Sequence, residues 1–199
     1  MGYSVVSLDR DIGRECPLKS GYLSEHHIKE DIMLWDYTQY PPQHFHLITA
    51  SPVCTWWSKV RASNIGRRIK GSSACYTREQ MENDIVTMGV PMVDRVFEIL
   101  DYFRPVFYII ENPQTGRMKD YINDLIPFYD VDYCQYSKWG YRKRTRLWTN
   151  IQGFHPKTCV CTGHKNHACS SEGGGNNRLP RYRIPFKLIR ELLTHVKNT

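Results

Sequence analysis

The sequence lacks the features that would place it in a membrane or direct it out of the cell. It has no run of about 18 apolar residues, which excludes a membrane-spanning helix and with it a membrane partner. Its N-terminus lacks the basic-then-apolar pattern of a secretory signal. Its seven cysteines are an odd number, which does not suit a disulfide framework. We therefore expect a reduced, intracellular protein whose 199 residues fit one domain.

Positive charge is in excess, with a formal net charge of +7 at pH 7. The basic residues gather in three segments, at 59–71, 138–146 and 178–183. This pattern suits a polyanionic partner, for which nucleic acid is the first candidate. A basic surface that only keeps the protein soluble explains the charge equally well, so charge alone does not decide.

Apolar patterning predicts an open α/β sheet, in which strands alternate with helices. The predicted strands are 3–9, 28–32, 44–51, 106–113 and a hairpin pair at 129–136 and 145–151. The predicted helices are 78–103, 116–126 and 184–196. In the longest of them, apolar residues recur every three or four positions, and Pro91 is expected to disturb it.

The chain divides into a domain at 1–151, a short loop insert at 152–181 and a closing helix of the same domain at 182–199. The insert contains five side chains of the kind that bind zinc: Cys159, Cys161, His164, His167 and Cys169. Their spacing is tighter than in a usual zinc knuckle, and no distant second pair completes the set. A zinc site and a polar loop that contacts DNA therefore both remain open.

Residues that carry chemistry follow three of the predicted strands. Asp9 ends the first strand, Cys54 follows the third, and Glu111 follows the fourth. Ligands bind at the carboxyl ends of the strands in such sheets, so we expect a site there. Taken alone, a free cysteine such as Cys54 is more often a small buried residue than a nucleophile. An Asn-Pro sequence such as the one after Glu111 is more often a plain turn that ends a strand.

Three motifs in order resemble the DNA cytosine-5 methyltransferase family, in particular its short viral and phage-like members. They are SPVCTWWS (51–58), ENP (111–113) and WGYRKRTRLWT (139–149). In the family they read Pro-Cys, Glu-Asn-Val and Gln-x-Arg-x-Arg. The resemblance covers roughly residues 3–150. It implies a Rossmann-like fold that uses S-adenosylmethionine.

The resemblance implies methyl transfer from S-adenosylmethionine to carbon 5 of a flipped cytosine. Cys54 would add to carbon 6 of the ring and make carbon 5 nucleophilic. Glu111 would neutralise the charge that develops near N3, provided that a dry site raises its pKa. Arg144 and Arg146 match the two arginines of the third motif and would hold the base carbonyl and order the cysteine loop.

By the same resemblance, Asp9 would accept the ribose hydroxyls of the methyl donor. Asp31 and Ile32 would flank the adenine, and Ser51 and Pro52 would lie beside the methionine end.

The target base must leave the stack before it can react. The loop at 55–77 would then close over it, with Trp56 or Trp57 filling space near the base. Residues of this loop would meet DNA phosphates: Ser58, Lys59, Arg61, Arg67, Arg68 and Lys70. For Arg142 and Lys143, by contrast, we expect a solvated charge run.

The chain also departs from the family. The opening strand and its Phe-x-Gly-x-Gly turn would lie before Tyr3, where this sequence has only Met1-Gly2. We therefore expect an N-terminally truncated version of the fold. Two alternatives follow: a catalytically inactive DNA-binding relative that has lost donor binding, or a subunit that acts with a partner completing the sheet.

Overall fold

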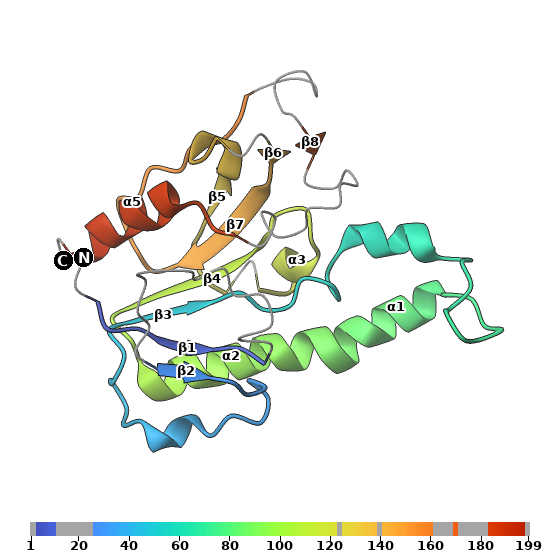
Figure 1. Cartoon of the computed structure of the whole chain (residues 1–199), viewed down its shortest axis with the longest axis horizontal. Coiled ribbons are helices and arrows are strands. Elements are labelled where there is room, and N and C mark those ends of the chain that lie inside the picture. The colour runs from blue at the N-terminus through green and yellow to red at the C-terminus, as the bar shows by residue number, and fades with distance from the viewer. Residues whose placement is uncertain are drawn as a thin grey trace.

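The protein is a mixed α/β structure centred on a four-stranded sheet of order β3–β4–β7–β5 (Figure 1). The computed structural model describes residues 3–10, 26–122, 125–138, 141–160, 169–170 and 183–197. β3 (Leu47–Ala50) and β4 (Phe107–Pro113) run parallel. β7 (Arg144–Thr149) is antiparallel to both β4 and β5 (Phe128–Asp132). The predicted third and fourth strands and the hairpin pair are thus confirmed.

A separate parallel pair is formed by β1 (Val6–Leu8) and β2 (His26–Ile28). β2 ends earlier than predicted, because Asp31 starts a turn. Its carboxylate accepts the backbone N–H of Met33 at 3.0 Å, and its carbonyl accepts those of the next two residues. The prediction of a strand over 28–32 was therefore wrong in its position, although a strand next to β1 exists.

A second short parallel pair joins β6 (Tyr141–Arg142) to β8 (Cys169–Ser170). We expected the insert at 152–181 to be a loop, and β8 corrects this at two positions. Most of the predicted insert lies outside the described residues.

The long predicted helix is confirmed as three consecutive segments: α1 (Arg78–Asp84), the π-helical turn η3 (Ile85–Gly89) and α2 (Val90–Phe103). Thr77 and Gln80 form a capping box at its start. The π turn directly precedes Pro91, which has no N–H to donate to the preceding turn. The expected disturbance at this proline is therefore present as a widened turn.

Helices cover both faces of the central sheet, because side chains alternate along its strands. α5 (Phe186–Lys197) packs on one face, where Leu188 and Leu192 meet Ile109 and Leu147. α2 and α3 (Met118–Ile122) pack on the other, around Ile110, Trp148, Val93 and Met118. Figure 1 shows α5 and α2 on opposite sides of the strands.

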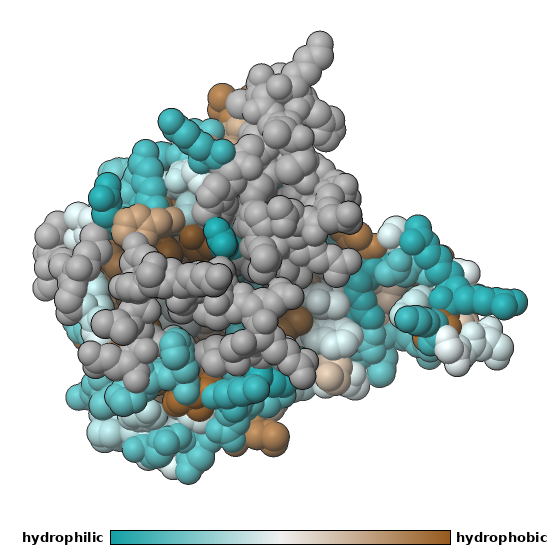
Figure 2. Space-filling view, viewed as in Figure 1, coloured by the Kyte–Doolittle hydropathy of each residue, from teal (hydrophilic) through white to brown (hydrophobic). Residues whose placement is uncertain are grey.

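The segment between β3 and α1 projects beyond the carboxyl ends of β3 and β4 (Figure 1). It consists of the 3₁₀ helix η2 (Lys59–Asn64) and a hairpin at 66–76. Figure 2 shows mainly hydrophilic side chains over this projection. Among the helices of the described ranges, none has the length and apolar character needed to cross a bilayer.

Candidate functional site

Cys54 lies in the turn that follows β3, at the carboxyl end of the strand. Its carbonyl accepts the N–H of Trp57 at 3.2 Å, which closes the turn. The side chain of Asn112, at the end of β4, donates to the carbonyl of Pro52 at 2.8 Å. Two neighbouring parallel strands are thereby joined at their ends, and the cysteine is held between them, as predicted for an α/β sheet.

The other end of this turn is anchored by Trp57, which is only 2% exposed. Its indole packs against Gly89, where an added Cβ would come within 3.0 Å of the ring. It also stacks on Tyr121 at a centroid distance of 5.9 Å, and its carbonyl accepts the N–H of Arg117 at 2.8 Å. Trp57 is therefore a core residue that fixes the turn. Of the two tryptophans that we expected near a flipped base, this leaves Trp56, which is partly exposed and whose ring centre lies 5.2 Å from the guanidinium carbon of Arg61.

Glu111 of β4 lies beside this turn and is 8% exposed. One of its carboxylate oxygens accepts a hydrogen bond from the hydroxyl of Tyr133 at 3.1 Å and another from the ammonium group of Lys143 at 3.2 Å. The Lys143 nitrogen also lies 4.9 Å from the centre of the Tyr133 ring. A buried carboxylate is thus paired and hydrogen-bonded, as burial requires.

Lys143 is a functional candidate that sequence reasoning missed. We expected a solvated charge, but its side chain is 16% exposed and pairs with Glu111. The family motif matches the nearby Arg144 and Arg146 and does not include this lysine. What identifies it is the register of the sheet. Leu147 of β7 lies opposite Glu111 in the β4–β7 ladder, and Thr145 points to the same face as Leu147. Lys143, two residues before Thr145, continues this alternation and so lies on the face of Glu111.

The Cys54 thiol is sensitive to these charges. Partial burial raises the pKa of Cys54 above its usual value. The ammonium group of Lys143 acts in the opposite direction and lowers that pKa, whereas the carboxylate of Glu111 raises it. The resting thiol is therefore mainly protonated at neutral pH, and Lys143 is the side chain that favours its thiolate.

The predicted arginines are held by carboxylates of β5. Arg144 binds Asp132 with its closest contact at 2.8 Å, and Arg146 grips Asp130 at 2.7 and 2.8 Å. Arg146 lies opposite Asn112 in the β4–β7 ladder, so both arginines point to the sheet face away from Glu111. The structure therefore brings Cys54 together with Glu111 and Lys143 and places the arginines in ion pairs between β5 and β7.

Asp132 is the centre of the β5–β7 ion pairs and is fully buried. It also accepts the backbone N–H of Cys159 at 2.7 Å and lies 3.4 Å from the guanidinium of Arg142. Burial by itself would raise the pKa of Asp132, but the bonds from Arg144 and Cys159 and the two arginine charges outweigh it and lower that pKa. The carboxylate is thus kept ionised inside the protein.

The residues predicted to hold a methyl donor follow three strands: Asp9 follows β1, Asp31 and Ile32 lie in the turn after β2, and Ser51 and Pro52 follow β3. The N–H of Asp9 donates to the carbonyl of Ile28 at 3.1 Å, and Arg10 lies 3.6 Å from Asp31. Ile32 packs against two of the core clusters. The last two of these residues lie between the end of β3 and Cys54. Ser51 is exposed and Pro52 is buried.

The loop predicted to meet DNA has a defined structure. Ser58 caps η2 by accepting the N–H of Val60, and Lys59 is exposed. Arg61 is mostly buried, in an ion pair with Asp84. The hairpin at 66–76 is closed by hydrogen bonds such as Tyr76 N–H to the Arg67 carbonyl at 3.0 Å. Three basic side chains are exposed along it: Arg67, Arg68 and Lys70.

Three of the five predicted zinc ligands, Cys161, His164 and His167, lie outside the described residues. Cys159 is buried and Cys169 belongs to β8. Cys134 lies beside Cys159, and burial together with a hydrogen bond between the two thiols raises the pKa of Cys134 to about 11. In the part of the chain that the structure describes, no group of three or more His, Cys, Asp or Glu side chains could hold a metal.

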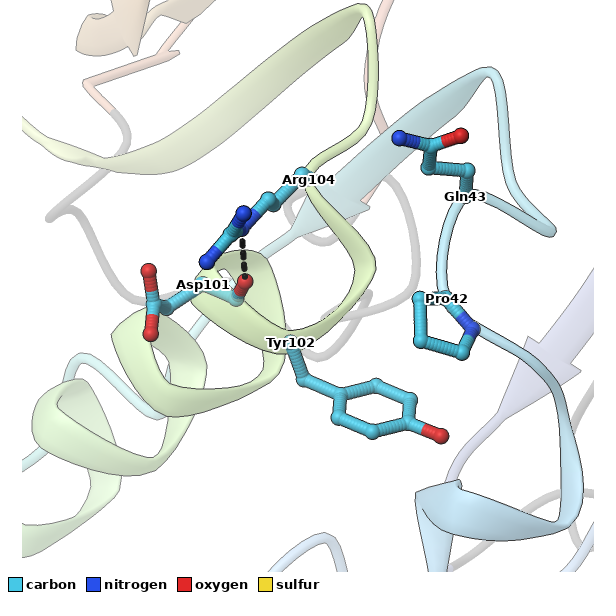
Figure 3. Close-up of a pocket in the computed structure, with 5 residues that line it drawn as sticks. All are labelled: Pro42, Gln43, Asp101, Tyr102 and Arg104. Atoms are coloured by element: carbon cyan, nitrogen blue, oxygen red, sulfur yellow. Dashed lines mark hydrogen bonds between the residues drawn. The ribbon is translucent and has the colours of Figure 1, made fainter.

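A hollow of about 440 Å³ (Figure 3) lies among residues that precede the amino ends of β3 and β4, whereas Cys54 follows the carboxyl end of β3. It is lined by Pro42, Gln43, Asp101, Tyr102 and Arg104, which come from the segment before β3 and from the end of α2. Gln43 and Arg104 both have positive φ angles, of 64° and 44°. The second ends a helix in the left-handed conformation, which is a common helix terminus. This hollow lies far from the Cys54 turn and does not take part in the site.

Comparison with known proteins gives one informative result. No protein-family model matches the chain. A protein of Frog virus 3 (isolate Goorha), named "Probable DNA (cytosine-5)-methyltransferase", is 40% identical to it. The similarity spans 92% of this chain and 93% of the viral protein. The two chains are therefore similar over nearly their whole lengths.

Proposed function

The chain belongs to the DNA (cytosine-5)-methyltransferase family of enzymes, and we propose that it methylates carbon 5 of a flipped cytosine with Cys54 as the nucleophile. The observation that carries this proposal is the meeting of three groups at the ends of β3 and β4. Asn112 binds the Cys54 turn to β4 by a hydrogen bond. The charges of Glu111 and Lys143 both act on the Cys54 thiol. A thiol, an acid and a cation in one place are the groups that this reaction needs.

Cys54 supplies the covalent step. Carbon 5 of cytosine is a weak nucleophile, and the thiolate changes this by forming a bond from its sulfur to carbon 6. The electron pair of the carbon 5–carbon 6 double bond then becomes available at carbon 5. S-adenosylmethionine, when bound, supplies the methyl group. Loss of the carbon 5 proton and rupture of the sulfur–carbon 6 bond afterwards restore the ring and the thiolate.

Glu111 deals with the charge that the attack places on the ring. A carboxyl group beside N3 can supply a proton there as negative charge develops. Tyr133 and Lys143 hold one carboxylate oxygen at 3.1 and 3.2 Å, which fixes the direction in which the group points. Because the ammonium group of Lys143 contacts the same carboxylate oxygen as Tyr133, we infer that Glu111 acts together with this cation.

Arg144 and Arg146 support the site through the sheet. Their ion pairs with Asp132 and Asp130 hold β7 against β5. The planar guanidinium forks suit these two-point contacts. β7 follows Lys143 directly, so fixing the strand also fixes the cation that pairs with Glu111. We propose this positioning role for both arginines, in addition to the contact with the base carbonyl that the family resemblance suggests.

The residues at the ends of β1 and β2 fit S-adenosylmethionine by their chemistry. Two carboxylates, of Asp9 and Asp31, stand at the carboxyl ends of neighbouring parallel strands, where ribose hydroxyls are commonly held. Ile32 offers an apolar side chain beside Asp31 for the adenine. We propose that these residues, with Ser51 and Pro52, bind the donor within a Rossmann-like arrangement of strands.

The proposal is tested by incubating the protein with unmethylated DNA and S-adenosylmethionine that carries a labelled methyl group. Label is expected in 5-methylcytosine, identified after digestion of the DNA to nucleosides. Within the described residues no ladder joins β1 to β3, so the inactive DNA-binding relative is a definite second candidate. DNA binding without labelled cytosine, from a protein that gives no heat with S-adenosylmethionine in calorimetry, would support that second candidate and refute the enzyme.

We further propose that the hairpin at 66–76 contacts the DNA backbone. The hairpin carries the exposed Arg68 and Lys70 and belongs to the segment that projects beyond the carboxyl ends of β3 and β4 (Figure 1), where we expect the substrate to approach. Replacing both by glutamine should flatten the slope of log affinity against log salt by about 2, since each phosphate contact contributes about 0.9. Fluorescence anisotropy with a labelled duplex between about 50 and 200 mM salt measures this slope.

A matched control for the hairpin variant lies on α5. Lys187 and Arg190 are also exposed and are likewise one lysine and one arginine. Their helix, α5, lies at the other side of the molecule from the hairpin (Figure 1). Their replacement by glutamine should leave the slope near that of the unmodified protein. Equal slopes for the hairpin variant and the unmodified protein would exclude the hairpin from the phosphate contacts.

A further inference from the structure

We propose that Lys143 is the positioning residue of the site, whose ammonium group holds Glu111 against Tyr133 beside the Cys54 turn and thereby sets how readily Cys54 reacts. This inference rests on the proposed function, because it assumes that the reactivity of Cys54 matters. It goes beyond the three motifs, which do not include this lysine.

The backbone of Lys143 is fixed on both sides. Its carbonyl accepts the N–H of Tyr133 at 3.0 Å, and the carbonyl of the next residue, Arg144, accepts the N–H of Gln114 at 3.1 Å. Arg144 is in turn bound to the buried Asp132. The side chain of Lys143 therefore leaves the backbone in a set direction, toward the end of β4.

Two titratable groups contact the ammonium group of Lys143. They are Glu111 of β4 at 3.2 Å and Tyr133 of η4 (Tyr133–Gln135), whose ring centre is 4.9 Å away. A third, Cys54 of the turn after β3, is acted on by its charge. The Lys143 side chain is only 16% exposed. Solvent therefore screens its charge less than that of an exposed lysine, and the charge acts more strongly on its neighbours.

Lys143 and Glu111 act on the cysteine in opposite directions. Burial of the thiol and the Glu111 carboxylate both raise the pKa of Cys54, and the side-chain charge that lowers it is that of Lys143. The effect of the ammonium group exceeds that of the carboxylate. Removal of the lysine charge should therefore make the thiolate scarcer, and removal of the glutamate charge should make it more abundant.

The test is the pH dependence of Cys54 alkylation by iodoacetamide, which reacts with thiolates. Trypsin releases residues 30–59 as one peptide that contains Cys54 and no other cysteine, so mass spectrometry follows this thiol alone. In Lys143→Gln the pH midpoint should rise by about one unit, the lower end of the effect of a nearby opposite charge, so alkylation below the midpoint slows about tenfold. Lys143→Arg should restore the original profile.

A second variant and a matched control keep the test decisive. Glu111→Gln should shift the midpoint downward, opposite to Lys143→Gln, which a general loosening of the fold could not produce. Lys157→Gln is the control, because Lys157 also pairs with a glutamate (Glu191, 2.8 Å) and lies over a tyrosine (Tyr136, 5.2 Å). It should leave the Cys54 profile unchanged.

The inference is overturned if Lys143→Gln leaves the midpoint unchanged, or if Lys157→Gln and Lys143→Gln shift it equally. The outcome is separable from that of the proposed function, since alkylation needs neither DNA nor methyl donor. A shifted midpoint in a protein that methylates nothing would support the role of Lys143 and reject the enzyme. A protein that methylates DNA, but whose Lys143→Gln variant shows an unshifted midpoint, would support the enzyme and reject the role of Lys143.

Discussion

Cys54→Ala is expected to abolish both methyl transfer and the covalent complex with DNA that contains 5-fluorocytosine. Loss of a covalent nucleophile typically lowers turnover by at least about a thousandfold. In the fluorinated substrate, carbon 5 carries no proton that can leave after methylation, so the sulfur–carbon 6 bond cannot break and the adduct accumulates. Alanine has no atom that can form this bond, and we expect no adduct at any time.

The complex is measured as a band of reduced mobility that survives denaturing electrophoresis. It should require S-adenosylmethionine, because the trap closes only after the methyl group has been received. Cys75→Ala provides the control: Cys75 is an exposed cysteine on the hairpin at 66–76, and its loss should leave the band unchanged. A band that persists in Cys54→Ala would show that another residue is the nucleophile.

The Cys54 turn and the end of β4 could be predicted because their signals are local. Each is a short apolar run that stops at small or polar residues, and the resulting strands are in place. The long helix was equally readable, from its apolar spacing and from Pro91, which follows the π turn. β2 was misplaced because Ile28 and Ile32 are both apolar, whereas Asp31 starts a turn that contains Ile32.

The roles of the basic residues at 142–146 could not be predicted in the same way. Alternation along a strand puts Arg144 and Arg146 on one face and Lys143 on the other, but it does not say which face carries Glu111. That choice depends on the register between β4 and β7, which sets Leu147 opposite Glu111. Register is fixed by packing over the whole sheet. Motif matching therefore identified the right segment and overlooked the lysine.

Asp132→Asn is expected to destabilise the fold by about 2–4 kcal/mol, somewhat less than a fully buried ion pair because the Arg144 side chain is 34% exposed. The asparagine keeps the volume of Asp132 but not its charge. Arg144 and Arg142 would lose their counter-ion, and the bond to the Cys159 N–H would weaken. Urea unfolding at neutral pH measures the loss. Glu191→Gln, which breaks the exposed pair with Lys157, should cost less than about 1 kcal/mol.

The pH dependence of the difference in unfolding free energy between the unmodified protein and Asp132→Asn shows whether the lost ion pair causes it. The pKa of Asp132 is lower in the folded protein than its usual value, so its ionised form stabilises the fold fully above the unfolded pKa of about 3.9. That contribution is lost as the pH falls through the folded pKa. The gap in unfolding free energy between the unmodified protein and Asp132→Asn should therefore be constant near neutrality and narrow below about pH 4. A gap that stays the same into acid would attribute the loss to packing, and the ion pair with Arg144 would then not be what holds β5 to β7.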